Sequence, residues 1–125
     1  MAPVKKKILI VEDEYFLAEM IRTRLQAHGY EASIAEDGEK ALDFLTKEKV
    51  DLILMDVILP VMDGWEAAKR IKADENLKGI PLIFLTALAR HEDHIKAHEV
   101  GGQDYLSKPF EMADLVTLVK KWVAP

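Results

Sequence analysis

The sequence predicts an α/β protein in which five strands form a parallel, doubly wound sheet flanked by five helices. Short apolar runs alternate along the chain with stretches whose apolar residues recur at helical spacing. This alternation is typical of parallel strands that are connected by helices covering both faces of the sheet. Three of the runs are almost wholly apolar, which is the pattern of strands buried on both faces.

The five expected strands are short segments rich in apolar residues. In chain order they are KILIV in the region 6–11, EASIA at 31–35, DLILMD at 51–56, PLIFLT at 81–86 and DYLS at 104–107. The first, third and fourth are the most continuous apolar runs, so we expect them to be buried on both faces.

Four of the five expected helices have a clear apolar face. The first carries Phe16, Leu17, Met20, Ile21 and Leu25 on one side, and the glycine at position 29 is a natural C-terminal stop. The faces of the second, third and fifth helices are formed by Ala41, Leu42 and Leu45; by Trp65, Ala68 and Ile71; and by Leu115, Leu118, Val119 and Trp122.

The fourth helix, from about His91 to Val100, has the weakest pattern. Ile95 and Val100 are its large apolar residues, so we expect the least firmly packed helix of the five. His91, His94 and His98 stand at positions i, i+3 and i+7, which could form a metal-binding or pH-sensing face. The segment HEDH does not match the HExxH zinc motif, and we interpret the three histidines as a solvated face.

Composition limits the classes of function. A chain of 125 residues, half of them hydrophobic, suits one domain spanning 1–125. Its net charge of −5 makes direct binding to nucleic acid or to an anionic membrane unfavourable. Without cysteine there is no disulfide, zinc–thiolate site or cysteine nucleophile. No apolar run approaches the roughly 18 residues of a membrane span or forms a signal peptide, so we expect a cytoplasmic protein.

Polar side chains with chemical potential follow four of the expected strands. Glu12 and Asp13 come after the first strand, Asp56 ends the third, Thr86 ends the fourth and Lys108 follows the fifth. Ligand sites of open α/β sheets form beyond the carboxyl ends of the strands. We therefore expect these five residues to converge in one crevice.

Carboxylates gathered in this way need a cation. Two like charges about 4 Å apart repel by about 4 kcal/mol at an effective dielectric constant of 20. Mg²⁺ removes such repulsion and binds oxygen ligands, which makes Glu12, Asp13 and Asp56 its candidate ligands. Calcium fits less well, because DVILPVMD lacks the acidic spacing of an EF-hand loop.

The same crevice suggests phosphoryl chemistry. Lys108 and the metal would neutralise a phosphoryl group, Thr86 would donate to one of its oxygens, and Asp56 is the best candidate for a covalent acceptor. Asp56 could instead merely end a strand and cap a turn, but its expected neighbours make that interpretation weaker. Asp63 and Gly64 are better explained as a turn and a helix N-cap.

The segments ILIVEDE, DLILMDVILPVMDGWE, PLIFLTA and GGQDYLSKPF resemble the receiver domain of bacterial two-component response regulators. They occur in the family's order and cover roughly residues 5–122, and together they are highly specific. The resemblance implies a flavodoxin-like fold with strand order 2-1-3-4-5. Gly102 departs from the alanine of many members, which we expect to loosen the loop before the fifth strand.

The resemblance also implies roles for particular residues. Asp56 would accept a phosphoryl group from a phosphohistidine on a sensor histidine kinase or a histidine phosphotransfer protein. Mg²⁺ would be held by Glu12, Asp13, Asp56 and the backbone carbonyl of Ile58. Lys108 would contact the phosphoryl oxygens, and the Lys108–Pro109 peptide bond would be cis.

Thr86 and Tyr105 would form the family's switch pair. Thr86 would move toward the phosphoryl group and the ring of Tyr105 would turn inward. The fourth helix, fifth strand and fifth helix would then present a changed surface to a downstream protein effector, with no direct role for nucleic acid or membrane. We expect a monomer or a weak phosphorylation-dependent dimer.

Such a protein is a regulatory phosphoacceptor that catalyses only its own phosphorylation and dephosphorylation. We expect a stand-alone receiver; the alternative is a receiver cut from a longer regulator with a DNA-binding or enzymatic output domain. An aspartyl-phosphate phosphatase would need an acid where Ile58 stands, and a flavin-binding protein would need a phosphate loop in place of VEDEYFL. A receiver-like protein that only binds partners is disfavoured by the intact set of site residues.

Overall fold

The computed structural model describes residues 4–88 and 90–125, in which five parallel strands form one sheet in the order β2-β1-β3-β4-β5. The strands are β1 (Lys7–Val11), β2 (Glu31–Ala35), β3 (Leu52–Met55), β4 (Leu82–Thr86) and β5 (Asp104–Ser107). Both the number of strands and their order confirm the prediction. The central strands β1 and β3 pair in register, with Ile8 opposite Leu52.

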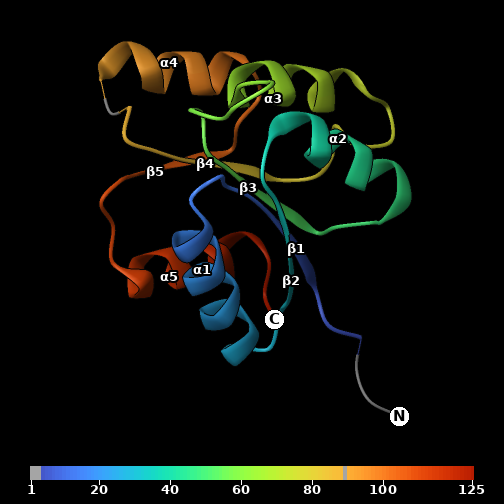
Figure 1. Ribbon diagram of the computed structural model, residues 1–125, viewed down its shortest axis with the longest axis vertical. Helices are drawn as coiled ribbons and strands as arrows, with labels where there is room; N and C mark the ends of the chain where they lie inside the picture. Colours follow the sequence, from blue (N-terminus) through green and yellow to red (C-terminus); the bar gives the residue numbers. More distant parts are fainter. Residues whose placement is uncertain (1–3, 89) are drawn as a thin grey trace.

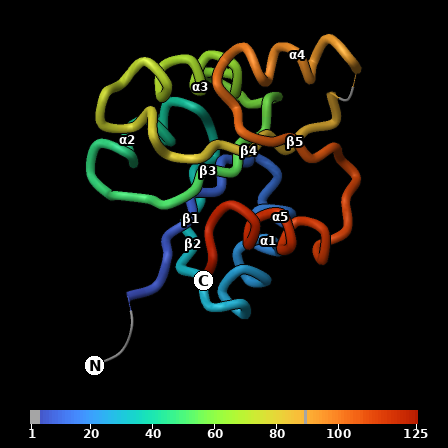
Figure 2. Tube along the Cα trace, turned by 180° about the vertical axis from the view of Figure 1, so that it is seen from behind, coloured from blue at the N-terminus to red at the C-terminus, as the bar shows by residue number. Residues whose placement is uncertain are grey.

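Five helices cover the sheet in this part of the chain. They are α1 (Tyr15–Ala27), α2 (Gly38–Lys47), α3 (Gly64–Ala73), α4 (His91–Glu99) and α5 (Met112–Trp122). Figures 1 and 2 show α2, α3 and α4 on one side of the sheet and α1 and α5 on the other. The doubly wound arrangement is therefore confirmed.

Alternate residues of the strands point into two separate cores. Leu9, Ile53 and Phe84 pack with α2 and α3, whereas Ile8 and Leu54 pack with α1 and α5. This two-sided burial explains why β1, β3 and β4 are nearly continuous apolar runs. Polar residues are accommodated where these strands stop, and all the strands stop at the same edge because they are parallel.

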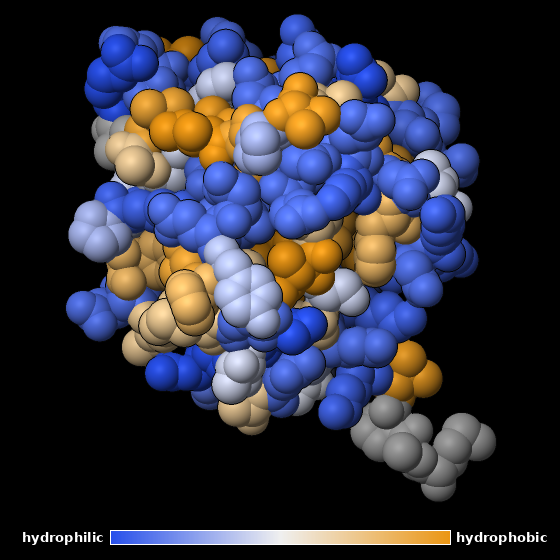
Figure 3. Space-filling view, in the orientation of Figure 1, coloured by the Kyte–Doolittle hydropathy of each residue, from blue (hydrophilic) through white to orange (hydrophobic). Residues whose placement is uncertain are grey.

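The apolar face of α1 is narrower than expected. Ile21 and Leu25 are buried as predicted, and Ala18 is buried with them. Phe16 is 81% exposed and Met20 is 57% exposed, so placing them on the packed face was wrong. Each stands five residues before a buried residue, Ile21 or Leu25, which at 3.6 residues per turn places it about 140° around the helix from that residue, on the solvent side. Figure 3 shows that hydrophobic patches are set among a mainly hydrophilic surface on this face of the molecule.

Few residues of α4 are buried. Asp93 and Ala97 are buried, Val100 packs at the edge of the core, and Ile95 is 46% exposed. Of the two large apolar residues in the sequence pattern, Val100 therefore contributes to the core more than Ile95 does. The small amount of buried apolar surface agrees with the expectation that α4 is the least firmly packed helix.

Gly102 lies directly under an aromatic ring. A Cβ atom at this position would stand 2.7 Å from Cε2 of Phe84 and 3.0 Å from the carbonyl oxygen of Ala97. Phe84 is fully buried and also packs against Trp65, with ring centroids 4.9 Å apart. The ring of Phe84 thus occupies the space that an alanine methyl group would need, so the glycine serves close packing rather than a loosened loop.

Replacing Gly102 by alanine is expected to lower the free energy of unfolding by about 1–3 kcal/mol, because the core is overpacked. Adding Phe84→Leu should relieve the overlap, so the double variant should lose less than the sum of the two single losses. Urea denaturation of the four proteins measures this coupling. Additive losses would contradict the proposed overlap.

Candidate functional site

Asp56 stands at the carboxyl end of β3, and both of its carboxylate oxygens are hydrogen-bonded. The residue is 5% exposed. Its backbone N–H donates to the carbonyl of Val11 at 3.0 Å, which fixes the loop against β1. Oδ1 accepts from the backbone N–H of Ile58 at 3.2 Å, and Oδ2 accepts from Nζ of Lys108 at 2.7 Å. The carboxylate is therefore held in one orientation at the sheet edge.

Lys108 links two carboxylates from different strands. Its Nζ donates to Oε1 of Glu12 and to Oδ2 of Asp56, both at 2.7 Å. Burial alone would lower the pKa of Lys108, but the hydrogen bonds to Asp56 and Glu12 outweigh burial and raise its pKa. Lys108 follows β5, and its backbone N–H donates to the carbonyl of Thr86 at 2.9 Å. The peptide bond to Pro109 is cis, as expected.

Glu12, Asp13 and Asp56 form a compact acidic cluster. Each offers a carboxylate oxygen, and these oxygens lie within 4.8 Å of one another. Burial raises the pKa of Glu12, although the hydrogen bond from Lys108 opposes the rise. Asp13 is exposed, so the cluster opens to solvent on one side. Three carboxylates with one ammonium retain negative charge, and an all-oxygen donor set of this kind suits a hard divalent cation.

Thr86 and Tyr105 lie on the neighbouring strands β4 and β5. Thr86 is fully buried, and its Oγ1 accepts a hydrogen bond from the backbone N–H of Leu88 at 3.3 Å. Tyr105 pairs with Phe84 in the sheet register and packs against the core beside α4. Among the described residues, neither hydroxyl group donates to Asp56, so the strands place this pair near the cluster without joining it to the acceptor.

The sequence did not reveal one contact near this site. The imidazole of His94 on α4 stacks on the ring of Tyr105, with the ring centroids 4.1 Å apart. The spacing of the three histidines describes one helix, but it does not say which strand that helix packs against. The contact therefore became visible only when α4 was placed over β5.

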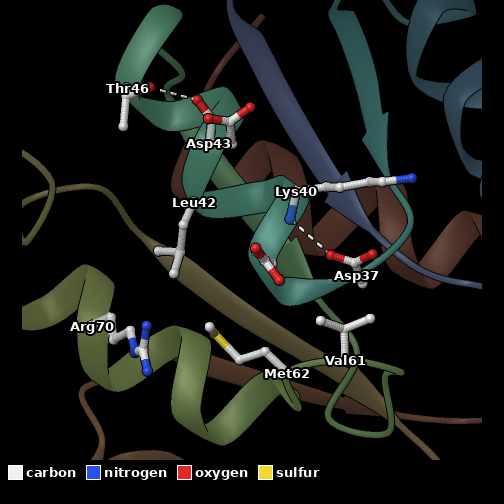
Figure 4. Close-up of a pocket in the computed structure, with 9 residues that line it drawn as sticks. Asp37, Lys40, Leu42, Asp43, Thr46, Val61, Met62 and Arg70 are labelled. Carbon is white, nitrogen blue, oxygen red and sulfur yellow. Dashed lines mark hydrogen bonds between the residues drawn. The ribbon is translucent and has the colours of Figure 1, made fainter.

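A wide groove of about 970 Å³ lies away from the acidic cluster, between α2, α3 and the loop after β3 (Figure 4). Figure 4 shows Asp37 and Lys40 at its rim, where the carboxylate of Asp37 accepts from the backbone N–H of Lys40 at 2.7 Å. This is an N-cap of α2. Asp63 caps α3 in the same way, as predicted, by accepting from the N–H of Glu66.

In the described part of the chain, no helix has both the length and the apolar character that crossing a membrane requires.

Comparison with known proteins agrees with the geometry of the site. The family model described as response regulator receiver domain matches residues 8–120. The phosphate regulon transcriptional regulatory protein PhoB of Pseudomonas aeruginosa is 44% identical over 117 residues, which are 94% of this chain and 51% of that protein. The chain thus spans about half the length of the curated relatives it matches.

Two solved structures are similar along nearly the whole chain. A putative response regulator from Chloroflexus aurantiacus superposes with a TM-score of 0.91 at 38% identity, covering 98% of this chain and all of that one. The receiver domain of the sensor histidine kinase PA1611 from Pseudomonas aeruginosa gives a TM-score of 0.88 at 36% identity, with 98% and 100% coverage. That structure is described with a magnesium ion coordinated in its active site cleft. With the family model matching residues 8–120, the chain belongs to the family of response regulator receiver domains.

Proposed function

We propose that Asp56 accepts a phosphoryl group from a phosphohistidine of a sensor histidine kinase or a histidine phosphotransfer protein. One observation carries this proposal: Lys108 donates 2.7 Å hydrogen bonds to both Glu12 and Asp56 at the open acidic cluster. A lysine held between the acceptor and a metal-ligand candidate supplies the positive charge that phosphoryl transfer requires. Receiver domains are regulatory signalling domains, and the proposed reaction is the self-modification of such a domain.

In the proposed transfer, a carboxylate oxygen of Asp56 forms a bond to phosphorus while the bond from phosphorus to the donor imidazole nitrogen breaks. The electron pair of the breaking bond stays on the imidazole. Lys108 moves its hydrogen bond from Oδ2 of Asp56 to a phosphoryl oxygen, and Thr86 donates to another. Glu12, Asp13, Asp56 and the backbone carbonyl of Ile58 are the groups that would hold Mg²⁺, which would neutralise charge on the transferred group.

The signal would leave through the surface of α4, β5 and α5. Phosphorylation adds a charge of roughly −1.5 to −2 at Asp56. Such a charge acts at a distance by favouring one of two existing arrangements, and the switch residues Thr86 and Tyr105 connect the acceptor to α4. We infer a protein effector as the partner, since the net charge of −5 disfavours direct contact of this domain with nucleic acid.

Incubation with Mg²⁺ and acetyl phosphate tests the acceptor. Mass spectrometry should find one acid-labile phosphoryl group on the wild type and none on the Asp56→Asn variant. Asp43→Asn is the control, because this exposed aspartate on α2 pairs only with Lys47 among the described residues. It should be modified like the wild type. An adduct that persists in Asp56→Asn, or no adduct on the wild type, would contradict the proposal.

Asp13→Asn is expected to abolish stabilisation by Mg²⁺ while leaving the metal-free protein at least as stable as the wild type. Asp13 is the exposed member of the cluster, so the substitution removes a candidate metal ligand and some charge repulsion but leaves no cavity in the core. Mg²⁺ at 100 times its dissociation constant should stabilise the wild type by about 2.7 kcal/mol. Thermal denaturation with and without Mg²⁺ measures this. Glu14→Gln, an exposed neighbour outside the cluster, should retain the effect.

A further inference from the structure

The stack between His94 and Tyr105 is not used by the proposed transfer. The ring centroids lie 4.1 Å apart and the ring planes are inclined by 31°. This is a closer approach than the 4.9 Å between Trp65 and Phe84 in the core. The imidazole therefore covers one face of the tyrosine ring. The opposite side of the imidazole faces solvent, because His94 is exposed.

Tyr105 is half-buried, and its hydroxyl group lies on the buried side of the ring. Its oxygen is buried and has no hydrogen-bond partner among residues 4–88 and 90–125. Burial, and then the carboxylates of Asp93 and Asp56, raise the pKa of Tyr105 to about 12, so the phenol stays neutral. A buried hydroxyl without a partner is unfavourable, and the ring must be held in place by other contacts.

Few other contacts are available on the α4 side. Of the residues of α4, Asp93 and Ala97 are buried, and Ala97 contributes only a methyl group. The ammonium of Lys96 lies over Trp65 of α3, 5.4 Å from the ring centroid, and so belongs to another part of the surface. The stack of His94 on Tyr105 is therefore one of the contacts that join α4 to β5.

We propose that His94 is the positioning residue for Tyr105: the imidazole holds the tyrosine ring in its buried position, and protonation of the imidazole strengthens that hold. The inference rests on the proposed function, in which Tyr105 belongs to the switch. A histidine changes charge between roughly pH 5 and 8, and the side chain of His94 is exposed. A cation over the face of an aromatic ring is attracted by the ring's quadrupole. Acidification should thus favour the buried ring.

Charged groups of both signs surround His94. The titratable groups near it on α4 are Arg90, His91, Asp93 and His98, and those on the β5 side are Tyr105 and, beyond that ring, Asp56 and Lys108. The hydrogen bond from Arg90, with a smaller contribution from the charge of His94, lowers the pKa of Asp93. Asp104 of β5 points to the opposite face, where it accepts from Trp122 of α5. Asp93 is an opposite charge on the same helix.

NMR of the tyrosine ring signals, recorded between roughly pH 5 and 8 without phosphodonor, tests the inference. In the wild type, the ratio of buried to exposed Tyr105 ring should rise about two- to fivefold on acidification, as the strength of an exposed cation–π contact implies. His94→Phe should keep the ring buried at every pH, because it preserves the stack without the charge. His94→Ala should shift the ring toward the exposed position at every pH.

His98→Ala is the matched control, since it removes another exposed histidine from α4 one turn away. It should titrate like the wild type. A Tyr105 signal that does not titrate in the wild type, or that titrates equally in His94→Ala, would overturn the inference. These measurements do not require phosphorylation, so a protein that fails to take up a phosphoryl group would contradict the proposed function while the ring signals still decide the role of His94.

The connection to the switch is tested by the rate of modification by acetyl phosphate in Mg²⁺. The ratio of the wild-type rate to the His94→Phe rate removes the pH dependence of the donor itself. This ratio should change about two- to fivefold across the titration of His94. A constant ratio would overturn the connection between His94 and the switch.

Discussion

Replacing Lys108 by methionine is expected to lower the free energy of unfolding of the metal-free protein by about 3–5 kcal/mol at neutral pH. Methionine keeps most of the apolar stem and removes the ammonium. The buried carboxylates of Glu12 and Asp56 then face each other without the cation that now binds both at 2.7 Å. Breaking a buried ionic group by removing one partner is costly, because the remaining charges stay buried and uncompensated. Urea denaturation measures the loss.

The loss of stability caused by Lys108→Met should increase as the pH rises. Burial already raises the pKa of Glu12, and the hydrogen bond from Lys108 partly opposes this rise. Without Lys108 the pKa of Glu12 rises further. A carboxyl group whose pKa is higher in the folded than in the unfolded state makes stability fall as the pH rises. The deficit of the variant should therefore grow from acidic to neutral pH and shrink when Mg²⁺ is added.

Lys121→Met provides the control for this prediction. Lys121 forms a solvent-exposed ion pair with Asp104 at 3.5 Å, and its side chain is 65% exposed. Exposed pairs of this kind contribute about 0–1 kcal/mol. The free energy of unfolding of the Lys121→Met variant should therefore fall only slightly, by an amount that is nearly independent of pH near neutrality. Equal losses in the two variants would contradict the central place of Lys108 in the site.

The sequence predicted the sheet and most of the site for a common physical reason. Strands covered on both faces must be continuously apolar, so a charged residue such as Asp56 stands out where β3 ends. Parallel strands end at one edge, so Glu12 and Lys108 could be expected beside it although they are far apart in the chain. The double hydrogen bond of Lys108 could not be predicted, because spacing along a sequence does not determine where a flexible side chain points.

Helical spacing already separates Phe16 and Met20 from the packed face of α1. Each stands five residues before a buried residue, Ile21 or Leu25, which is about 140° around a helix of 3.6 residues per turn, and both are exposed. The stack of His94 on Tyr105, in contrast, depends on which strand lies under α4. It is a contact between elements, whereas periodicity describes each element by itself.

Gly64→Ala is expected to destabilise the protein by about 3 kcal/mol or more, at the upper end of the range for overpacking. A Cβ atom at Gly64 would stand 2.2 Å from the carbonyl oxygen of Asp56 and 2.7 Å from Cα of Val57. Both atoms belong to the backbone, so no side-chain rotation can relieve the overlap. The N–H of Gly64 donates to the carbonyl of Val57 at 2.8 Å, which holds the start of α3 against the end of β3.

The same substitution should impair phosphorylation beyond its effect on stability. The overlap displaces the backbone of Asp56, and with it the carboxylate that must lie in line with the phosphoryl donor; small displacements of a reacting group are costly to the rate. Modification by acetyl phosphate, measured where the variant is still folded by circular dichroism, should therefore be slower than in the wild type.

Gly79→Ala is the matched control, because no atom lies within 4 Å of a Cβ built at Gly79. It should leave both stability and phosphorylation almost unchanged. If Gly64→Ala behaved like Gly79→Ala, the prediction would be wrong, because the backbone after β3 would then have moved to accept the added Cβ atom at little cost.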